Sequence, residues 1–464
     1  MQKSFLFDLN KCTGCQACQL ACIIENKISS GRSWRQVLTF NEVHYPSIQV
    51  IHYSLTCNHC LQAPCIVSCP TLALSRDSET GVILLDDKKC IGCKYCSWVC
   101  PYDALHYNYT ANSMEKCTFC APRLKEGKEP ACVTGCPTGA LLSGEYKNNK
   151  NAFAHRAREF PGFPDIGIEP AIELIPLKKD RKTPEMSAFS DTHVSAERIN
   201  LQSAVPKIHK KITVVKELPL IVFTTIAAIL VPLFYAVLTN KVTILPLFYI
   251  ALGAGAYGIS TFHLGKKMRA VRAILNWRHS WLSREIILFS VFFALSAGYL
   301  LLDITVPIIG WTIITIGALS LIAMDRIYVI RSVISKQKMH SGTVLLTALF
   351  WTGIFTRQWL IIYWFAFMKL FLYTMRIAER LKQRKIVLLL MSGIRIIFGF
   401  IIPYIVYKRT GNKYISTVIS SIVIGELIDR CEFYADFDVI SPQKQIDEDL
   451  KNVIKHSQKS YFKK

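Results

Sequence analysis

The chain has 464 residues, 51% of them hydrophobic, and its 55 Lys and Arg against 33 Asp and Glu give a formal net charge of +22. This length exceeds that of one ordinary domain. The basic excess does not indicate nucleic-acid binding, because many Lys and Arg residues stand in short loops between apolar stretches, a pattern typical of membrane proteins. We therefore expect no nucleic-acid partner.

The first part of the chain is dominated by cysteine. Sixteen of the 17 cysteines lie within the first 136 residues, in four groups of four. The groups are Cys12, Cys15, Cys18, Cys22; Cys57, Cys60, Cys65, Cys69; Cys90, Cys93, Cys96, Cys100; and Cys117, Cys120, Cys132, Cys136. The third reads C-x2-C-x2-C-x3-C-P, the bacterial ferredoxin pattern that ligates a [4Fe-4S] cluster. Sixteen thiolates are what four such clusters require.

Zinc and disulfides are the competing uses of these cysteines. Structural zinc sites typically use two separated C-x2-C pairs, not runs of four that end in proline. Disulfides suit small secreted domains, whereas the start, MQKSFLFDLNKCTGCQAC, lacks the apolar segment of a signal peptide. The pattern favours iron–sulfur clusters. Cys431, far away in an apolar segment, is expected to be an inert buried thiol.

Composition divides the rest of the chain. Residues 1–190 are rich in Cys, Pro and charge and predict a four-cluster ferredoxin-type domain. The polar stretch 191–217 is typical of a linker. Residues 218–432 are dominated by apolar segments and predict a membrane anchor, and residues 433–464 form a polar, basic C-terminal tail.

Six apolar segments are long enough to cross a membrane. They lie near residues 218–238, 242–263, 286–303, 305–324, 386–407 and 414–430. The stretch 342–375 is interrupted by Arg357 and Gln358, and its halves are shorter than the roughly 20 residues that a span needs. We interpret it as two tilted helices that turn at 356–358, the alternative being one long buried helix. The prediction is an all-α polytopic membrane domain of about eight transmembrane helices.

Loop charges predict the orientation of this domain. Sixteen basic residues stand in loops on the side of the cysteine-rich domain, against five on the other side. The sixteen are Lys266, Lys267, Arg269, Arg272, Arg278, Arg284, Arg326, Arg331, Lys336, Lys338, Lys369, Arg376, Arg380, Lys382, Arg384 and Lys385. The positive-inside rule then predicts a bacterial inner-membrane protein with this domain in the cytoplasm.

The motifs CTGCQACQLAC, CNHCLQAPCIVSCP, CIGCKYCSWVCP and CTFC…CVTGCP resemble the four-cluster electron-transfer subunit of the dimethyl sulfoxide reductase family. The stretch HLGKKMRAVRAILNWRHSWLSRE, residues 263–285, resembles the membrane anchor of the same family, with the polysulfide-reductase type of anchor as the alternative. These subunits are usually two separate polypeptides, so the sequence resembles their fusion. The resemblance implies an α+β double-ferredoxin-like iron–sulfur domain followed by the membrane domain.

The resemblance also implies which cysteines share a cluster. The first set is Cys12, Cys15, Cys18 and Cys136; the second is Cys117, Cys120, Cys132 and Cys22; the third is Cys57, Cys60, Cys65 and Cys100; the fourth is Cys90, Cys93, Cys96 and Cys69. The family places the first near the molybdenum subunit and the last near the membrane. Cys93 is present where some relatives lack a cysteine, so we expect four [4Fe-4S] clusters and no [3Fe-4S] centre.

His263 and Glu285 are the predicted quinol site. His263 ends the second span and Glu285 begins the third, so a helical hairpin brings both to the same membrane face. Quinol oxidation releases protons, for which these side chains are suitable acceptors. Similar anchors use a His and a Glu at this spacing for menaquinol. The alternatives are a helix-capping histidine, and a glutamate paired with Arg284 or Arg278.

Ionisable residues also occur inside the last two predicted spans. Arg395 lies near the middle of the seventh, and Glu426 lies in the eighth. A lone charge at this depth is costly, so we predict an Arg395–Glu426 contact, structural or else proton-conducting. Evenly spaced intramembrane histidines that would ligate haem are absent from the sequence, so we expect no haem.

The function expected from this resemblance is electron transfer in anaerobic respiration. Electrons would pass from menaquinol in the membrane quinone pool, through four [4Fe-4S] clusters, to a separate molybdopterin catalytic subunit that reduces an S- or N-oxide. The protein would carry the quinol-oxidising half-reaction without acting on the terminal substrate. The alternatives are flow in reverse from a formate-type dehydrogenase, a polysulfide or thiosulfate reductase, and more remotely a transporter with a zinc-binding soluble domain, for which paired broken helices would be needed.

Overall fold

The computed structural model describes residues 1–28, 33–40, 50–146, 155–156, 160, 163, 166–178, 212–330, 340–382, 386–411, 413–437 and 439–446. The chain forms two compact units. The cysteine-rich unit comprises Met1–Cys90, Lys94–Lys210 and Val439–Lys464, and the helical unit comprises Ile91–Cys93 and Lys211–Asp438. Most of the predicted linker, up to residue 211, and the tail beyond residue 446 lie outside the described residues.

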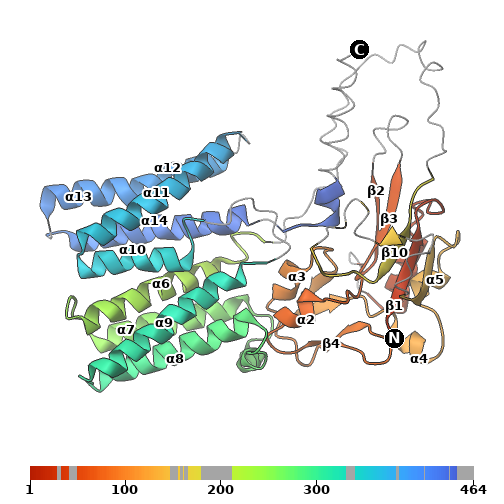
Figure 1. Cartoon of the computed structure of the whole chain (residues 1–464), viewed down its shortest axis with the longest axis horizontal. Helices are drawn as coiled ribbons and strands as arrows, with labels where there is room; N and C mark the ends of the chain where they lie inside the picture. Colours follow the sequence, from red (N-terminus) through yellow and green to blue (C-terminus); the bar gives the residue numbers. More distant parts are fainter. Residues whose placement is uncertain are drawn as a thin grey trace, which may run out of the picture. The chain divides into compact units, whose positions relative to one another are not determined.

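The cysteine-rich unit is built from short strands and short helices (Figure 1). Its strands are β1 (Lys3–Asp8), β2 (Gln36–Phe40), β3 (Ile51–Leu55), β4 (Leu74–Arg76), β5 (Ile83–Leu85), β6 (Leu105–Asn108), β7 (Ser113–Lys116), β8 (Leu141–Glu145), β9 (His155–Arg156) and β10 (Ile172–Ile175). Its helices are α1 (Ala17–Glu25), α2 (Pro64–Ser68), α3 (Tyr95–Val99), α4 (Ala121–Lys125) and α5 (Ala131–Thr134). This is the expected α+β fold.

Strand β1 lies inside a four-stranded sheet of order β8-β1-β10-β9, beside three hairpins that pair β2 with β3, β4 with β5 and β6 with β7. Phe5 lies opposite Ile172 of the parallel strand β10, and Phe7 lies opposite Leu141 of the antiparallel strand β8. Residues two apart on a strand share a face, so Phe5 and Phe7, both buried, point into one core. Phe5 also stacks on Phe119 of the fourth cysteine group, with ring centroids 4.2 Å apart.

The short helices bring the cysteine groups together in pairs. Helix α1 packs on α5, and α2 packs on α3. The first packing is very close, because a Cβ atom added at Gly135, which ends α5, would lie 2.8 Å from Ala21 Cβ in α1. The first group therefore lies beside the fourth, and the second beside the third.

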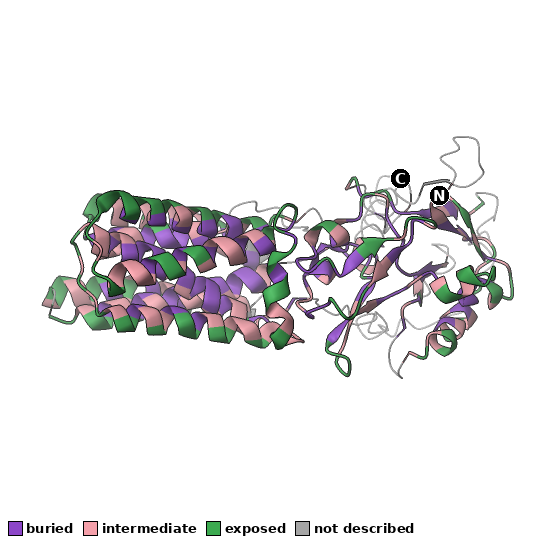
Figure 2. Cartoon of the chain, turned by 90° about the horizontal axis from the view of Figure 1, so that it is seen from below, coloured by how far each residue is buried: buried purple, intermediate pink, exposed green. Residues whose placement is uncertain are grey.

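The helical unit is a bundle of helices with similar axis directions (Figure 1). Its elements are α6 (Leu218–Leu238), α7 (Pro246–Ser260), η4 (Thr261–His263), η5 (Lys267–Ile274), α8 (Trp281–Leu301), α9 (Pro307–Ile327), α10 (Val344–Thr356), α11 (Trp359–Lys382), α12 (Ile386–Ile396), η6 (Ile397–Ile401), α13 (Ile402–Thr410) and α14 (Ile415–Asp436). Helix α6 is central, since it packs against α7, α9, α10 and α14. Buried residues line the interior, while exposed ones cover the outside (Figure 2).

The outer surface of this bundle is apolar. Leu360 and Phe367 of α11 are 84% and 64% exposed, and Leu390 of α12 is 65% exposed. Large apolar side chains exposed in such numbers mark a surface that is covered in the cell, here by lipid for helices of this length. The protein is thus a multi-pass membrane protein, in agreement with the sequence.

The number of spans is only partly as predicted. Five helical segments among the described residues are long and apolar enough to cross a membrane: Leu218–Leu238, Trp281–Leu301, Pro307–Ile327, Trp359–Ala378 and Leu388–Thr410. A sixth results if Pro246–His263 and Lys267–Ile274, bent by 104°, form one span. Helix α10 is apolar, but its 13 residues span only about 20 Å. Helix α14 is long enough but contains too many charged residues to be counted among these spans. The structure therefore supports five or six spans rather than eight.

The interrupted stretch 342–375 forms two helices, as predicted. Arg357 ends α10 in a left-handed conformation, with φ of 55°, and α11 begins two residues later. The two helices pack against each other.

The loop-charge count needs a correction. Lys369, Arg376 and Arg380 lie in helix α11 and are buried, so they are not loop residues. Arg284 in α8, Arg326 in α9 and Lys382 at the end of α11 also lie within helices. They must be removed from the sixteen, while Arg331, Lys336, Lys338, Arg384 and Lys385 lie outside the described residues. Two smaller differences are that α14 continues to Asp436, past the predicted boundary at 432, and that Cys431 is half-buried rather than buried.

Candidate iron–sulfur and quinol sites

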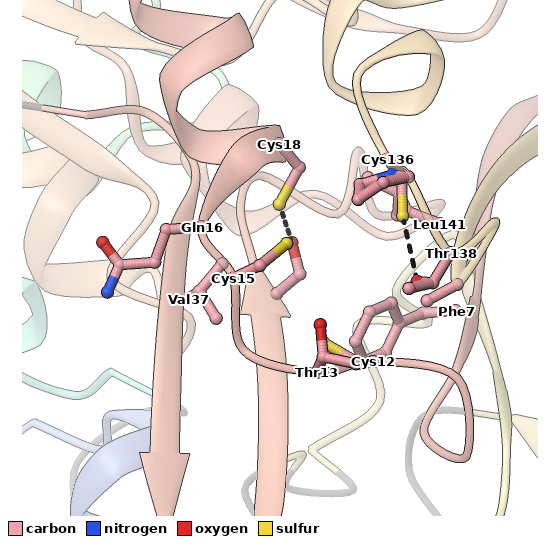
Figure 3. A pocket seen from close by; sticks show the side chains of 13 residues that line it. Phe7, Cys12, Thr13, Cys15, Gln16, Cys18, Val37, Cys136, Thr138 and Leu141 are labelled. Carbon is pink, nitrogen blue, oxygen red and sulfur yellow. Dashed lines mark hydrogen bonds between the residues drawn. The ribbon is translucent and has the colours of Figure 1, made fainter.

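One pocket in the cysteine-rich unit is lined by Cys12, Cys15, Cys18 and Cys136 (Figure 3). The first three come from the turn before α1 and from α1 itself, and Cys136 follows α5. Hydroxyl groups flank two of the sulfurs: Ser54 Oγ lies 3.4 Å from Cys18 Sγ, and Thr138 Oγ1 lies 3.7 Å from Cys136 Sγ. Cysteines more than 100 residues apart in the sequence thus line one pocket. They are the same four that the resemblance assigns to the first cluster.

In two further sets, the cysteines of each set are close enough to change one another's pKa. Burial, followed by the neighbouring thiol of Cys117, raises the pKa of Cys22 to about 12, and Cys132 and Cys120 act in the same direction. Charged thiolates in one small volume repel each other, so each thiol holds its proton more firmly. These four are the second implied set.

The third implied set behaves in the same way. Burial raises the pKa of Cys60 well above its usual value, and Cys57, Cys100 and Cys65 contribute in that order. As ligand sets of clusters all four stay predictions, including the fourth, which consists of Cys69, Cys90, Cys93 and Cys96. In that set the backbone N–H of Ala73 donates to Cys69 Sγ over 3.3 Å.

The four cysteine groups share an unusual backbone conformation. The residue before the second cysteine has a positive φ in each: Gly14 at 72°, His59 at 44°, Gly92 at 70° and Phe119 at 57°. Such angles are strained for His and Phe, and strained residues concentrate at functional sites. In the fourth group the turn lets the N–H of Phe119 donate to Cys117 Sγ over 3.3 Å. The sequence signal for this turn is the glycine in the first and third groups.

The donor atoms fit iron–sulfur clusters. Each set offers four thiols, the ligands that [4Fe-4S] clusters use. Zinc held at about 2.3 Å by four sulfurs would require these sulfurs to be about 3.8 Å apart. Among the described residues, no three Cys, His, Asp or Glu side chains are grouped closely enough to hold a single metal ion. The pocket lined by Cys12, Cys15, Cys18 and Cys136 places four thiols around one space, as a [4Fe-4S] cluster requires.

In the helical unit, His263 and Glu285 lie at the same end of the α7–α8 hairpin. Tyr257 Oη of α7 hydrogen-bonds Ser290 Oγ of α8 over 2.8 Å, which fixes the register of the two helices. His263 lies six residues after Tyr257 and Glu285 five residues before Ser290. Counted along the helices from the Tyr257–Ser290 hydrogen bond, His263 lies about 9 Å and Glu285 about 7.5 Å toward the same end of the hairpin.

The two residues differ in environment. His263 is half-buried, and its Nδ1 contacts the Ser260 carbonyl oxygen. Glu285 is only 6% exposed, although Arg284 beside it is turned to the Trp277 and Arg278 carbonyl oxygens. Arg284 therefore hydrogen-bonds backbone and not Glu285, against the alternative of an Arg284–Glu285 ion pair.

Two residues near Glu285 were missed by the sequence analysis. Tyr257 lies close enough for Glu285 to act on it electrostatically, and Arg430 of α14 acts electrostatically on Glu285. Arg430 is held by Thr224 Oγ1, at 3.1 Å, and by the Gly342 carbonyl oxygen, at 2.8 Å. Tyr257, six residues before His263 in the sequence, could have been identified from this spacing, whereas Arg430 comes from the distant helix α14.

The predicted Arg395–Glu426 contact is confirmed. Arg395 Nη2 lies 3.5 Å from Glu426 Oε1 and 3.2 Å from Asp429 Oδ2, and all three side chains are buried. Lys369 Nζ lies 2.6 Å from Glu426 Oε2 and 3.7 Å from Asp429 Oδ2.

The contact belongs to a larger buried ionic network. Arg376 Nη2 lies 2.8 Å from Asp429 Oδ1, and Arg380 lies 3.1 Å from Glu432 Oε1 and 2.5 Å from Asp436 Oδ2. The acidic residues of α14 recur at intervals of three and four, and so occupy one face of that helix. The cations of α11 recur at intervals of seven and four on the facing helix. This helical spacing is the signal that the loop count overlooked.

Comparison with known proteins gives a consistent result. Residues 48–146 match the family described as 4Fe-4S dicluster domain, and residues 212–374 match the family described as DMSO reductase anchor subunit (DmsC). The sequence is 37% identical over 196 residues to a chain of the anaerobic dimethyl sulfoxide reductase of Escherichia coli strain K12, an alignment that covers 40% of this sequence and 95% of the relative.

Other relatives of this kind have different names. A subunit of tetrathionate reductase from Salmonella typhimurium is 36% identical over 190 residues, with 39% of this sequence and 76% of the relative covered. A subunit of sulfite dehydrogenase from Allochromatium vinosum is 34% identical over 204 residues, with 39% of this sequence and 85% of the relative covered. The similarity is thus to subunits of enzymes named for several oxidised and reduced sulfur compounds.

Proposed function

Because this protein belongs to the iron–sulfur subunit family of anaerobic dimethyl sulfoxide reductase and carries a DmsC anchor, we propose that it transfers electrons from menaquinol to a separate catalytic subunit. The convergence of Cys12, Cys15 and Cys18 with the remote Cys136 on one pocket is the observation that carries this proposal. It supports a ligand set for a cubane cluster at one end of an electron-transfer path.

The sixteen cysteines would hold four [4Fe-4S] clusters in the four implied sets. When bound, these clusters supply one-electron carriers in series. The protein's part is to keep them apart from water: 12 of the 16 cysteines are buried, three are half-buried and Cys15 is exposed. The catalytic partner would bind the terminal substrate, with an S- or N-oxide as the first candidate.

The anchor would carry the quinol half-reaction. Oxidation of one menaquinol gives menaquinone, two electrons and two protons, so two proton acceptors are needed where the hydroxyl groups bind. Glu285 and His263 would serve as these acceptors. Tyr257 would orient one hydroxyl group, and Arg430 would stabilise the carboxylate form of Glu285.

The opposite direction of flow is a second candidate. The relative named for sulfite dehydrogenase favours it, since a dehydrogenase delivers electrons rather than receiving them. The two directions are distinguished by whether the assembled complex oxidises menaquinol or reduces menaquinone at a higher rate. For orientation we propose a cytoplasmic iron–sulfur domain, and the periplasmic face if the catalytic partner is exported.

The full-length protein, purified without oxygen, is expected to be brown and to contain about sixteen irons and sixteen acid-labile sulfides, four of each per cubane. The measurement is elemental analysis together with electron paramagnetic resonance (EPR) of the reduced protein. A colourless protein with stoichiometric zinc would contradict the four-cluster proposal and favour the zinc-binding alternative.

A Tyr257→Phe change is expected to raise the KM for menaquinol about tenfold, because it removes the hydroxyl group proposed to orient the quinol. Tyr249→Phe is a matched control: Tyr249 Oη hydrogen-bonds Ser296 Oγ over 3.0 Å between the same helices, about two turns further from Glu285. Steady-state kinetics with a menaquinol analogue compare the two variants. Equal effects would indicate that Tyr257 only stabilises the hairpin.

A further inference from the structure

Two buried cations in the cysteine-rich unit form no ion pair with Asp or Glu anywhere in the described residues. Arg35 is 1% exposed and Lys116 is 2% exposed. Burying a cation is costly unless an anion compensates it. Within the described residues, the groups around both side chains are backbone oxygens, a serine hydroxyl group and the thiols of the cysteine sets.

Arg35 lies between the first and second cysteine sets. Its Nη1 donates to Ser54 Oγ over 2.9 Å, and the same oxygen lies 3.4 Å from Cys18 Sγ of the first set. Cys132 and Cys117 of the second set are the strongest electrostatic partners of its guanidinium group. The guanidinium also stacks on the Phe5 ring, 4.5 Å from the centroid, which fixes its plane. Nη2 is buried and has no hydrogen-bond partner among the residues that the structure describes.

Lys116 lies between the second and third sets. Its Nζ donates to the carbonyl oxygen of Cys117, at 2.7 Å, and to that of Ile83, at 2.5 Å. The N–H of Ile83 donates in turn to His59 Nδ1 over 3.0 Å, and His59 stands between Cys57 and Cys60 of the third set. Lys116 also acts electrostatically on Cys57 and Cys65.

We propose that Arg35 and Lys116 are fixed counter-cations that raise the reduction potentials of the iron–sulfur clusters on either side of them. This rests on the proposed four-cluster function. A cubane with four thiolates is an anion, and it gains one further negative charge when it is reduced. A buried cation nearby favours the more negative, reduced form, because attraction is strong where the dielectric constant is low. Arg35 acts on the first and second clusters, and Lys116 acts on the second and third.

The test is a redox titration of the full-length protein, followed by EPR at each cluster, in Arg35→Gln and Lys116→Gln. Arg35→Gln is expected to lower the reduction potentials of the first and second clusters. Lys116→Gln is expected to lower those of the second and third, so the second cluster responds to both substitutions. Each reduction equilibrium is expected to change at least tenfold, which is about 59 mV for one electron. Lys128→Gln is the control, since Lys128 is an exposed cation paired with Glu126 at 2.8 Å. It is expected to shift none.

Charge-conserving variants separate charge from packing. Arg35→Lys and Lys116→Arg are expected to keep the potentials near those of the natural protein. If a glutamine variant loses its clusters, restoration of cluster content by the charge-conserving variant supports the proposal, and equal loss in both overturns it. Unchanged potentials in fully assembled glutamine variants also overturn it. Absence of iron–sulfur signals from the natural protein would instead refute the proposed function itself.

Discussion

Replacing Glu285 by Gln is expected to abolish menaquinol-driven turnover of the assembled complex and to leave turnover with an artificial electron donor intact. Gln has nearly the same shape as Glu but accepts no proton. A positioned proton acceptor contributes about 100- to 10,000-fold in rate, so quinol oxidation should fall by at least 100-fold. Donors that reduce the clusters directly bypass this step. The measurement is the ratio of the two activities in membranes with equal amounts of the protein.

A suitable control is Asp303→Asn. Asp303 follows helix α8, so it lies at the end of that helix opposite to Glu285, and it is exposed. The substitution removes a carboxylate from the same segment and should leave both activities unchanged. Normal quinol-linked turnover in Glu285→Gln would remove Glu285 from the proposed site.

The second large effect is expected for Asp429→Asn, in the buried ionic network. Asp429 is fully buried, and its carboxylate lies within 3.7 Å of the cationic groups of Arg376, Arg395 and Lys369. Loss of its charge leaves these cations with too few anions in a medium of low dielectric constant. Breaking such a buried pair costs about 3–5 kcal/mol. We expect a strongly reduced amount of folded protein in the membrane and a lower unfolding temperature in detergent.

A double-mutant cycle on Lys369 and Glu426 tests whether the network is structural. Their charged groups are 2.6 Å apart, and both side chains are buried. Lys369→Met or Glu426→Leu alone leaves one charge buried without its nearest partner, whereas the double variant removes both charges. The double variant should therefore unfold at a higher temperature than either single one. Additive losses would show that the direct pair contributes no coupling energy, and loss of quinol oxidation with full stability would favour proton conduction.

The sequence was most informative where the chemistry is local. Three cysteines at intervals of three, as in Cys90, Cys93 and Cys96, wrap one cluster with neighbouring residues, so the spacing alone predicts it. The fourth ligand comes from elsewhere, and the implied partnership of Cys136 with Cys12 required a resemblance. The bounds of α6 agree with the predicted span, because an uninterrupted apolar run ends at polar residues on both sides.

Distant contacts explain most of what was missed. Lys369 stands near the end of an apolar run, where loop counting treats every cation as solvated. Helix α11 continues to Lys382, and the partners of its cations come from α14, more than 40 residues further along. The predicted count of eight spans was wrong for a related reason. Helix α10 is too short for a span and α14 carries too many charges for one. Both helices pack against neighbouring helices of the bundle, which the sequence pattern does not reveal.

The most direct test of the proposed electron path is the reduction of the clusters by a menaquinol analogue in membranes that contain this protein and no catalytic partner. Iron–sulfur EPR signals are recorded after addition of the quinol and again after a strong chemical reductant. Quinol should generate a large part of the chemically reducible signal in the natural protein and almost none in Glu285→Gln. The proposed path would be contradicted if the chemical reductant reduced the clusters of the natural protein and the quinol left them oxidised.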